Sequence, residues 1–256
     1  MASVNDIRLD GRLALITGAS SGFGAHFARV FVAAGARVAL GARRKNLVDA
    51  LAEELGPAAL PLELNVEDES SIIKAFDAAE EHFGAAVDTV IANAGRASGA
   101  RATDIEGSEA RSTIDVNLTG AFFTAREGAR RMIKAGSRET RRGRIVLIGS
   151  ITARQTRSLD SLYASSKAAI AHLGRNLARE WSRQGINVNV VQPGHVDTGF
   201  HGTWLETEPG KAFVNAFDRK RLVPIEAVDP IVKYLASDDS EFMTGSIIDM
   251  DDGQSL

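Results

Sequence analysis

The chain has 256 residues and a formal net charge of −3, and 44% of its residues are hydrophobic. This composition is typical of a soluble globular protein, and the length allows one large domain. The balanced charge, without a basic stripe in any segment, argues against a nucleic-acid partner. There is no cysteine, which excludes disulfides and thiolate metal sites, and the five histidines show no metal-binding spacing. We therefore predict no metal.

The first twelve residues mix charged and apolar side chains, without the continuous apolar core of a signal peptide. No apolar run approaches the roughly 18 residues needed to span a bilayer. We expect a cytoplasmic protein with no membrane association, and import into an organelle stays open.

Short apolar runs alternate with longer amphipathic segments along the chain. This alternation predicts right-handed βαβ units in an α/β fold, with a parallel sheet in one domain over residues 1–256. Several runs are apolar on both sides, which is typical of strands covered by helices on both faces. The expected strands are 13–17, 37–42, 59–64, 87–92, 143–149, 186–191 and 246–250. The expected helices are 22–34, 46–55, 69–83, 108–135, 160–183 and 226–237.

One stretch, residues 198–222, is irregular by pattern but retains large apolar side chains such as Phe200, Trp204 and Phe213. A loop of this length that keeps apolar groups indicates a substrate lid.

The first expected strand runs into a glycine-rich turn over residues 17–24 and then into a helix. Gly18, Gly22 and Gly24 allow a tight turn and close approach of the backbone to a pyrophosphate. The helix N-terminus supplies free N–H groups and a partial positive charge. A simple strand-to-helix turn is the alternative, but the order strand, turn, helix favours a nucleotide site.

The end of the second strand bears on the choice of cofactor. NAD sites usually place Asp or Glu there to hold the ribose 2′-hydroxyl. Here the strand ends in Arg43 and Arg44, and no acid follows until Asp49. A guanidinium such as that of Arg43 pairs well with a 2′-phosphate. The pattern favours NADP(H), with NAD(H) possible. The alternative is that the two arginines are a solvated pair at a helix start.

Four residues form a candidate catalytic group. Tyr163 and Lys167 are four apart in a helical pattern and share one face, where an ammonium and an oxidised nicotinamide would lower the tyrosine pKa. Ser150 follows a strand and is placed to bind a substrate oxygen, unless it only caps a turn. Asn117 interrupts an apolar helix, so its buried amide is either a structural bridge or the holder of a water chain to Lys167.

These motifs occur in the order found in one family. Thr17 to Gly24 match Thr-Gly-x-x-x-Gly-x-Gly, and Asn-Ala-Gly, the Asn-Ser-Tyr-Lys tetrad and Pro-Gly with a later threonine follow. The chain therefore resembles the short-chain dehydrogenase/reductase family over essentially its whole length. The resemblance implies a Rossmann fold with a seven-stranded parallel sheet, and commonly a homotetramer, with a homodimer as the alternative. It implies cofactor contacts from Gly18, Ser20, Ser21, Gly22, Phe23, Gly24, Arg43, Asn65, Val66, Asn93, Ala94, Gly95, Tyr163, Lys167, Pro193, Gly194, Val196 and Thr198.

The resemblance also implies roles for the tetrad. Lys167 would bind the nicotinamide ribose and lower the pKa of Tyr163, which would protonate the carbonyl oxygen. Ser150 would orient that oxygen, and Asn117 would hold a water for proton resupply. The chain departs from the family at Asn65, where Asp often meets adenine, and at Gly149, where serine is frequent. We expect both changes to have little effect.

The sequence says less about the substrate. Arg96, Arg154 and Arg157 are expected near the mouth of the site and would suit a carboxylate or phosphate group. Solvent exposure or subunit contacts are the alternative. A basic loop at the opposite end is expected to be solvated: Arg138, Arg141, Arg142 and Arg144.

The sequence thus predicts an NADP(H)-dependent oxidoreductase that interconverts a small-molecule carbonyl and a secondary alcohol, as a carbonyl or 3-oxoacyl-type reductase. An alcohol or sugar dehydrogenase working oxidatively is the alternative. A sensor without turnover is disfavoured because Tyr163 and Lys167 are both present. A dehydratase or epimerase would show no net change in cofactor redox state.

Overall fold

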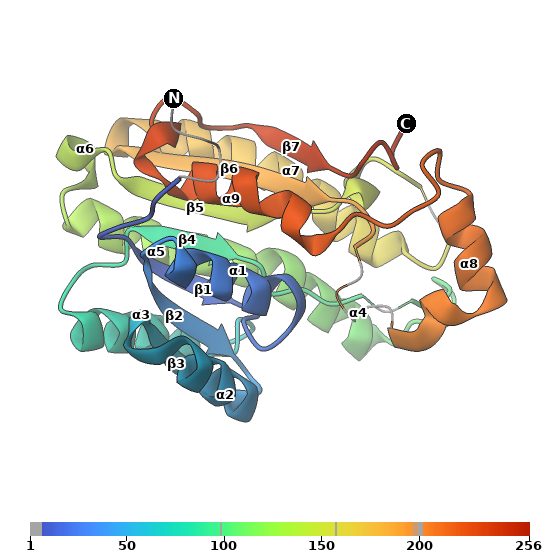
Figure 1. Ribbon diagram of the computed structural model, residues 1–256, viewed down its shortest axis with the longest axis horizontal. Helices are drawn as coiled ribbons and strands as arrows, with labels where there is room; N and C mark the ends of the chain where they lie inside the picture. Colours follow the sequence, from blue (N-terminus) through green and yellow to red (C-terminus); the bar gives the residue numbers. More distant parts are fainter. Residues whose placement is uncertain (1–6, 98, 157, 197, 199–201) are drawn as a thin grey trace.

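The computed structural model describes residues 7–97, 99–156, 158–196, 198 and 202–256. Within them, seven strands form one sheet in the order β3-β2-β1-β4-β5-β6-β7, and every neighbouring pair is parallel (Figure 1). This confirms the predicted α/β fold. The strands are β1 (Leu13–Thr17), β2 (Arg37–Ala42), β3 (Ala59–Glu63), β4 (Thr89–Ala92), β5 (Gly143–Ile148), β6 (Ile186–Pro193) and β7 (Ile247–Met250).

The strand order reverses between β1 and β4. From β1 the chain builds outward through β2 to β3, then returns to place β4 on the other side of β1, where Leu15 aligns with Val90. Open parallel sheets bind ligands at such a switch point, beyond the carboxyl ends of the strands. The sheet topology therefore fixes where a site belongs.

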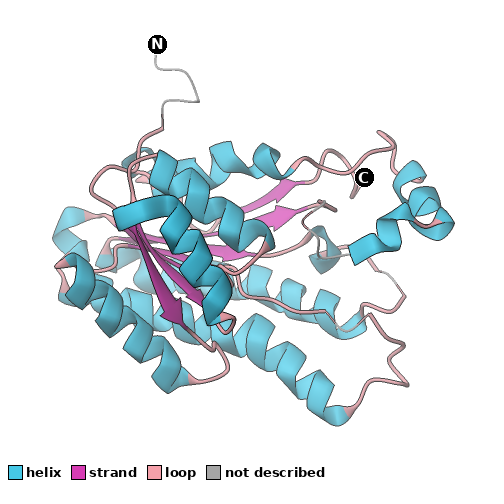
Figure 2. Cartoon of the chain, turned by 60° about the horizontal axis from the view of Figure 1, so that its bottom comes forward, coloured by secondary structure: helices cyan, strands magenta, loops and turns pink. Residues whose placement is uncertain are grey.

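Helices cover both faces of the sheet (Figure 2). Helices α1, α2 and α9 pack on one face and α3, α5 and α7 on the other, while α8 lies beyond the carboxyl ends of the strands (Figure 1). The helices are α1 (Gly22–Ala33), α2 (Lys45–Leu55), α3 (Glu69–Phe83), α4 (Gly107–Ile114), α5 (Gly120–Lys134), α6 (Ser137–Thr140), α7 (Ser161–Trp181), α8 (Glu208–Asn215) and α9 (Asp229–Ala236).

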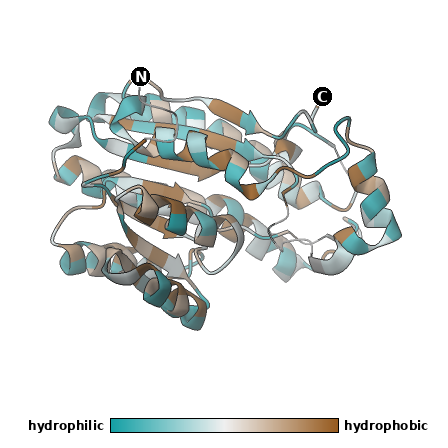
Figure 3. Cartoon of the chain, viewed as in Figure 1, coloured by the Kyte–Doolittle hydropathy of each residue, from teal (hydrophilic) through white to brown (hydrophobic). Residues whose placement is uncertain are grey.

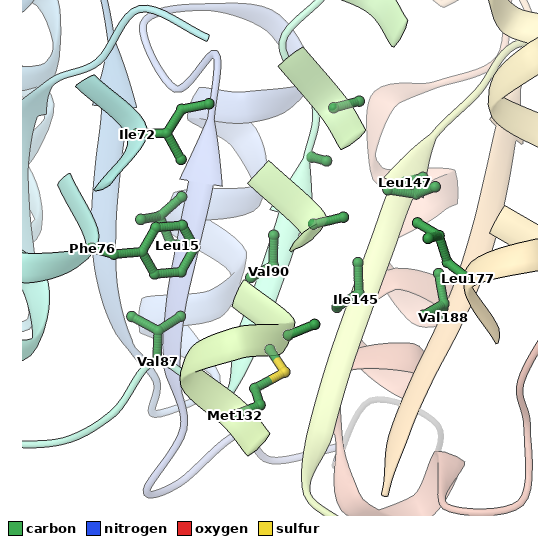
Figure 4. Close-up of a cluster of buried hydrophobic side chains, with 14 of the residues drawn as sticks. Leu15, Ile72, Phe76, Val87, Val90, Met132, Ile145, Leu147, Leu177 and Val188 are labelled. Carbon is green, nitrogen blue, oxygen red and sulfur yellow. The ribbon is translucent and has the colours of Figure 1, made fainter. Parts of the chain in front are cut away.

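Two apolar cores result, one on each face. In the first, Leu15, Val90 and Ile145 of neighbouring strands meet Phe76 of α3 and Leu177 of α7 (Figure 4). The second core lies under α1, α2 and α9. The central strands are therefore apolar on both sides, while polar residues gather on the outer helix surfaces (Figure 3). The double burial accounts for the continuous apolar runs in the sequence.

Two expected elements differ from the prediction. The single helix over 108–135 is interrupted by a π-helical turn at Asp115–Thr119, which separates α4 from α5. The stretch 198–222 is not irregular throughout, because α8 occupies Glu208–Asn215 and the Thr207 hydroxyl caps it by accepting from Gly210 N at 3.2 Å. Phe200 lies outside the described residues.

The basic loop before β5 is wrongly predicted to be solvated throughout. Arg144 is 1% exposed and donates to Ser237 O at 2.9 Å, to Ser240 Oγ at 3.1 Å and to Arg141 O at 2.8 Å. Burial lowers the pKa of Arg144 to about 10. Arg12 is also buried and contacts the nearby loops. These arginines satisfy carbonyl groups at the amino ends of the strands.

We expect Arg144→Ala to lower the free energy of unfolding by about 2–3 kcal/mol, because buried acceptors lose their donor. Chemical denaturation measures this change. Arg138→Ala removes an exposed arginine from the same loop and serves as the control, with an expected change below about 0.5 kcal/mol. Equal losses in the two variants would contradict a special role for the buried side chain.

Candidate active site

The turn between β1 and α1 needs glycine at three positions. Gly18 and Gly22 have φ of +70° and +53°, in the left-handed region. A Cβ on Gly24 would lie 2.3 Å from Gly18 O, and one on Gly18 would lie 2.9 Å from Ala94 Cα. The turn is therefore a backbone cradle at the N-terminus of α1, and it fits a pyrophosphate.

Asn93 supports this turn from β4. Its Nδ2 donates to Thr17 O at 2.9 Å, while the backbone N–H groups of Asn93 and Ala94 both donate to Thr17 Oγ1 at 3.1 Å. These bonds join the carboxyl ends of β1 and β4 at the switch point. Asn93 is thus a support for the cradle in the structure, and a direct cofactor contact stays a prediction.

Arg44 lies across the cradle, which the sequence did not reveal. Its Nη2 donates to Ser20 Oγ at 2.8 Å and to Ser21 Oγ at 2.6 Å. The sequence showed only that Arg44 adjoins Arg43, and spacing alone does not show which loop a side chain crosses. Phe23, at the start of α1, stacks on Phe27 with ring centroids 5.5 Å apart.

Arg43 faces a different neighbour. Its Nη1 lies 3.3 Å from Glu67 Oε2, beyond the ends of β2 and β3. A cavity of about 320 Å³ opens beside Arg43. A second cavity, of about 420 Å³, lies far from this site, at the amino ends of the strands. The smaller cavity is lined by Arg43, Glu63, Asn65, Asp68, Ser71 and Lys74.

Asn65 uses its amide locally. Its Oδ1 accepts from Glu67 N at 3.2 Å, so the oxygen expected to meet adenine already holds the loop after β3. Val66 is buried beside Gly120, where an added Cβ would lie 2.8 Å from Val66 Cβ. The two residues shape this end of the site.

Tyr163 and Lys167 lie one turn apart on α7, as predicted. Lys167 is 4% exposed, donates from Nζ to Ile148 O at 2.8 Å, and lies 5.7 Å from the centroid of the Tyr163 ring. Burial lowers the pKa of Lys167 to about 8. Burial also raises the pKa of Tyr163 to about 12, offset in part by a hydrogen bond with Ser150. Desolvation outweighs this hydrogen bond, and the lowering expected from the Lys167 ammonium and an oxidised nicotinamide stays a prediction.

Ser150 lies two residues after the end of β5 and is 9% exposed. Its Oγ accepts from Thr152 N at 3.2 Å and from Thr152 Oγ1 at 2.9 Å, which caps a short 3₁₀ turn over Ile151–Ala153. The Ser150 side chain therefore both caps this turn and forms a hydrogen bond with Tyr163.

Asn117 lies in the π-helical turn and is 1% exposed. Its Nδ2 donates to Arg96 O at 2.9 Å and to Ser166 Oγ at 3.0 Å, and its Oδ1 accepts from Arg96 N at 2.8 Å. A Cβ on Gly95 would lie 3.6 Å from both Asn117 Oδ1 and Lys167 Nζ, so the two groups are close. The amide bridges two elements, and π turns are frequent at functional sites.

Gly149 lies against the side chain of Gln192 on the neighbouring strand, a contact that the sequence did not reveal. A Cβ there would lie 2.9 Å from Gln192 Cγ, so the serine frequent in the family would not fit without a shift. Gln192 is 1% exposed, and its two amide atoms have no hydrogen-bond partner within the described residues. Gln192 therefore occupies the space that a side chain at position 149 would need, and the expectation that Gly149 has little effect stays a prediction.

The loop after β6 brings the C-terminal segment to the site. Gly194 leaves room for Gln254, whose Oε1 accepts from His195 N at 2.6 Å. Gln254 also donates from Nε2 to Arg221 O at 3.2 Å, and its backbone O accepts from Gln155 Nε2 at 2.8 Å. Gln254 thus joins three loops at the mouth, two through its side chain and one through its backbone.

The expected lid starts beside the cradle. Thr198 Cβ would lie 3.5 Å from a Cβ on Gly22, and Val196 forms a parallel bridge with Val223. Farther along, aromatic rings pack together: His195 stacks on Phe217 at 5.6 Å, and Trp204 lies 5.5 Å from Phe213. Pro193, the last residue of β6, leads into this loop.

Two of the three arginines expected near the substrate, Arg96 and Arg154, already have partners within the protein. Arg96 Nη1 donates to Ser112 Oγ at 2.8 Å, and Arg154 pairs with Asp249. Arg157 lies outside the described residues. For Arg96 and Arg154 the contacts favour a structural role.

No group of three His, Cys, Asp or Glu side chains suited to a metal ion occurs in the described part of the chain. In the same part, no helix is both long and apolar enough to cross a membrane.

Comparison with known proteins gives one consistent result. The family model for short chain dehydrogenases matches residues 12–209. The chain is 33% identical over 250 residues to an oxidoreductase of Sarocladium schorii, covering 96% of each chain. It is 31% identical over 247 residues to the 3-oxoacyl-[acyl-carrier-protein] reductase FabG of Escherichia coli, covering 96% of this chain and 98% of that protein.

A solved structure agrees with these matches. The 3-ketoacyl-(acyl-carrier-protein) reductase of Brucella melitensis, complexed with NADH, superposes with a TM-score of 0.89 at 28% identity, covering 97% of this chain and all of that chain (100%). The protein belongs to the short-chain dehydrogenase/reductase family. It is an oxidoreductase acting on CH–OH and C=O groups, with a nicotinamide cofactor.

The pKa values predict how the reaction depends on pH. Tyr163 stays protonated up to a pKa of about 12, whereas the Lys167 ammonium loses its proton above about 8. We expect kcat/KM for carbonyl reduction to be constant below pH 8 and to fall above it, approaching about tenfold per pH unit. Initial rates from pH 6 to 10 would check this. A profile that stays flat to pH 10 would contradict it.

Proposed function

We propose that the protein is an NADP(H)-dependent carbonyl reductase that converts a small-molecule ketone to a secondary alcohol. One observation carries the cofactor choice: two arginines, and no acid, follow β2 at the cradle. Arg44 lies over Ser20 and Ser21, and Arg43 faces the adjoining cavity. Two guanidinium groups at this point support binding of a 2′-phosphate, since an NAD site usually has a carboxylate at the end of this strand.

The proposed mechanism assigns one task to the cofactor and one to each of four side chains. The nicotinamide, when bound, supplies or accepts the hydride. The phenol of Tyr163 donates its proton to the substrate oxygen, and its raised pKa keeps it protonated for that role. Ser150 orients the same oxygen, and Lys167 binds the ribose hydroxyls through its ammonium. Asn117 holds the turn beside Lys167 and positions a water for proton resupply.

Oxo-acyl thioesters are the substrate class we favour, because two of the similar proteins are named 3-oxoacyl or 3-ketoacyl reductases. An alcohol or sugar dehydrogenase working oxidatively is the second candidate, and the putative gluconate dehydrogenase among the similar structures, at 32% identity, favours it. The raised pKa of Tyr163 supports its role as the acid in reduction, whereas the oxidative reaction uses the phenolate as the base.

We further propose that residues 198–222 act as a lid over the substrate. Thr198 beside the cradle and the aromatic cluster of His195, Trp204, Phe213 and Phe217 support a hinged wall of this kind. We also propose a homotetramer, or a homodimer, working in the cytoplasm.

Replacing Tyr163 tests the catalytic assignment. We expect Tyr163→Phe to lower kcat for NADPH-dependent reduction of a 3-oxoacyl thioester by at least about a hundredfold, because the proton donor is lost. The Kd for NADPH, from fluorescence titration, should change less than twofold. Retained turnover would remove Tyr163 from the acid role and with it the proposed mechanism.

Replacing Arg43 tests the cofactor assignment. We expect Arg43→Leu to weaken NADPH binding by about tenfold or more, because a charge-assisted contact with the 2′-phosphate is lost. NADH binding should change little, and titration of both cofactors measures the difference. Equal weakening for the two cofactors would show that Arg43 does not read the phosphate.

A further inference from the structure

A chain of polar contacts runs between the two ends of the site, through side chains as far as Arg96 and then through the Arg96 backbone. Glu67 stands between them: its Oε2 lies 3.3 Å from Arg43 Nη1, and its Oε1 accepts from Ser112 Oγ at 2.7 Å. Ser112 Oγ in turn accepts from Arg96 Nη1 at 2.8 Å. The donor and acceptor directions are consistent, since one hydroxyl donates to the carboxylate and accepts from the guanidinium.

The chain ends at the catalytic group. The backbone of Arg96 is held by Asn117 at two points, Arg96 N to Oδ1 at 2.8 Å and Nδ2 to Arg96 O at 2.9 Å. Ser112 holds the Arg96 side chain, and Glu109 lies 3.9 Å from it. Asn117 therefore lies at the end of a path that starts at Glu67.

At its other end, Glu67 contacts Arg43, the side chain proposed to hold the 2′-phosphate of the cofactor. Arg43 has a side chain 66% exposed, and its one carboxylate contact in the described structure is with Glu67, which is 25% exposed. A 2′-phosphate on Arg43 would have to share the guanidinium with this carboxylate, and the two negative groups would repel each other. Glu67 thus opposes the preference that Arg43 creates.

We propose that Glu67 is a positioning residue that serves both ends of the site. It restrains Arg43 and so limits the discrimination between NADPH and NADH, and through Ser112 it holds Arg96 against Asn117. The proposal rests on the proposed function, because it takes Arg43 as the group that reads the 2′-phosphate.

Three variants of the full chain separate the two effects. Glu67→Gln removes the charge but keeps an oxygen that accepts from Ser112. Glu67→Ala removes both, and Ser112→Ala breaks the path while leaving the carboxylate beside Arg43. Each variant is measured for the Kd of NADPH and of NADH, and for kcat at saturating cofactor and ketone.

For Glu67→Gln, we expect the ratio of Kd for NADH to Kd for NADPH to rise about threefold, the size of a partly exposed charge interaction. The kcat of Glu67→Gln should stay within about twofold of the kcat of the unsubstituted protein. Glu67→Ala should show the same rise together with a fall in kcat of about fivefold, the effect of losing one hydrogen bond. Ser112→Ala should show only the fall in kcat.

Glu63→Gln is the matched control, because it removes the same charge from the same cavity without a contact to Arg43 in the described structure. An equal rise in the ratio for this variant would overturn the pairing of Glu67 with Arg43. An unchanged ratio in both Glu67 variants would do the same, and an unchanged kcat in Ser112→Ala would overturn the path to Asn117.

Arg43→Leu distinguishes failure of this inference from failure of the proposed function. If Arg43→Leu abolishes NADPH preference while the Glu67 variants leave it unchanged, only the role of Glu67 is overturned. If Arg43→Leu leaves the preference unchanged as well, the assignment of Arg43 falls and the inference falls with it.

Discussion

The structure of the site depends on the hydrogen bonds that join the carboxyl ends of β1 and β4. Thr17 accepts two backbone hydrogen bonds from the β4 end, and Asn93 reaches back to Thr17 O. These hydrogen bonds bring three features to one place: the switch point of the sheet, the glycine cradle and the N-terminus of α1. Arg44 can then cross the cradle, and Gly95 can bring Asn117 close to Lys167.

Burial governs the chemistry of the groups around this point. Desolvation pushes the pKa of Tyr163 up and that of Lys167 down, so both favour their neutral forms. A neutral phenol suits proton donation. An anionic group that binds beside Lys167 would raise the pKa of the lysine and favour its charged form. The structure thus leaves the charge state of Lys167 sensitive to what binds, and holds Tyr163 ready as an acid.

Local pattern was enough to predict most of the fold. The apolar runs marked the strands, and the spacing of Tyr163 and Lys167 placed them on one helix face. The features that this pattern did not predict depend on contacts between segments far apart in the sequence. The burial of Arg144 arises from residues about a hundred positions later, and the crowding at Gly149 comes from Gln192 on the neighbouring strand. The position of Arg44 over the cradle depends on a side-chain direction that composition does not encode.

Gln254 joins His195, Arg221 and Gln155, which come from three loops far apart in the sequence. Gln254 follows all three of these residues in the chain, so the loops cannot be joined until residue 254 has been made. The hydrogen bonds that hold the glycine cradle connect β1 with the residues that follow β4, and all of these residues are made earlier. During synthesis, the contacts that complete the mouth of the site therefore become available later than those that hold the cradle.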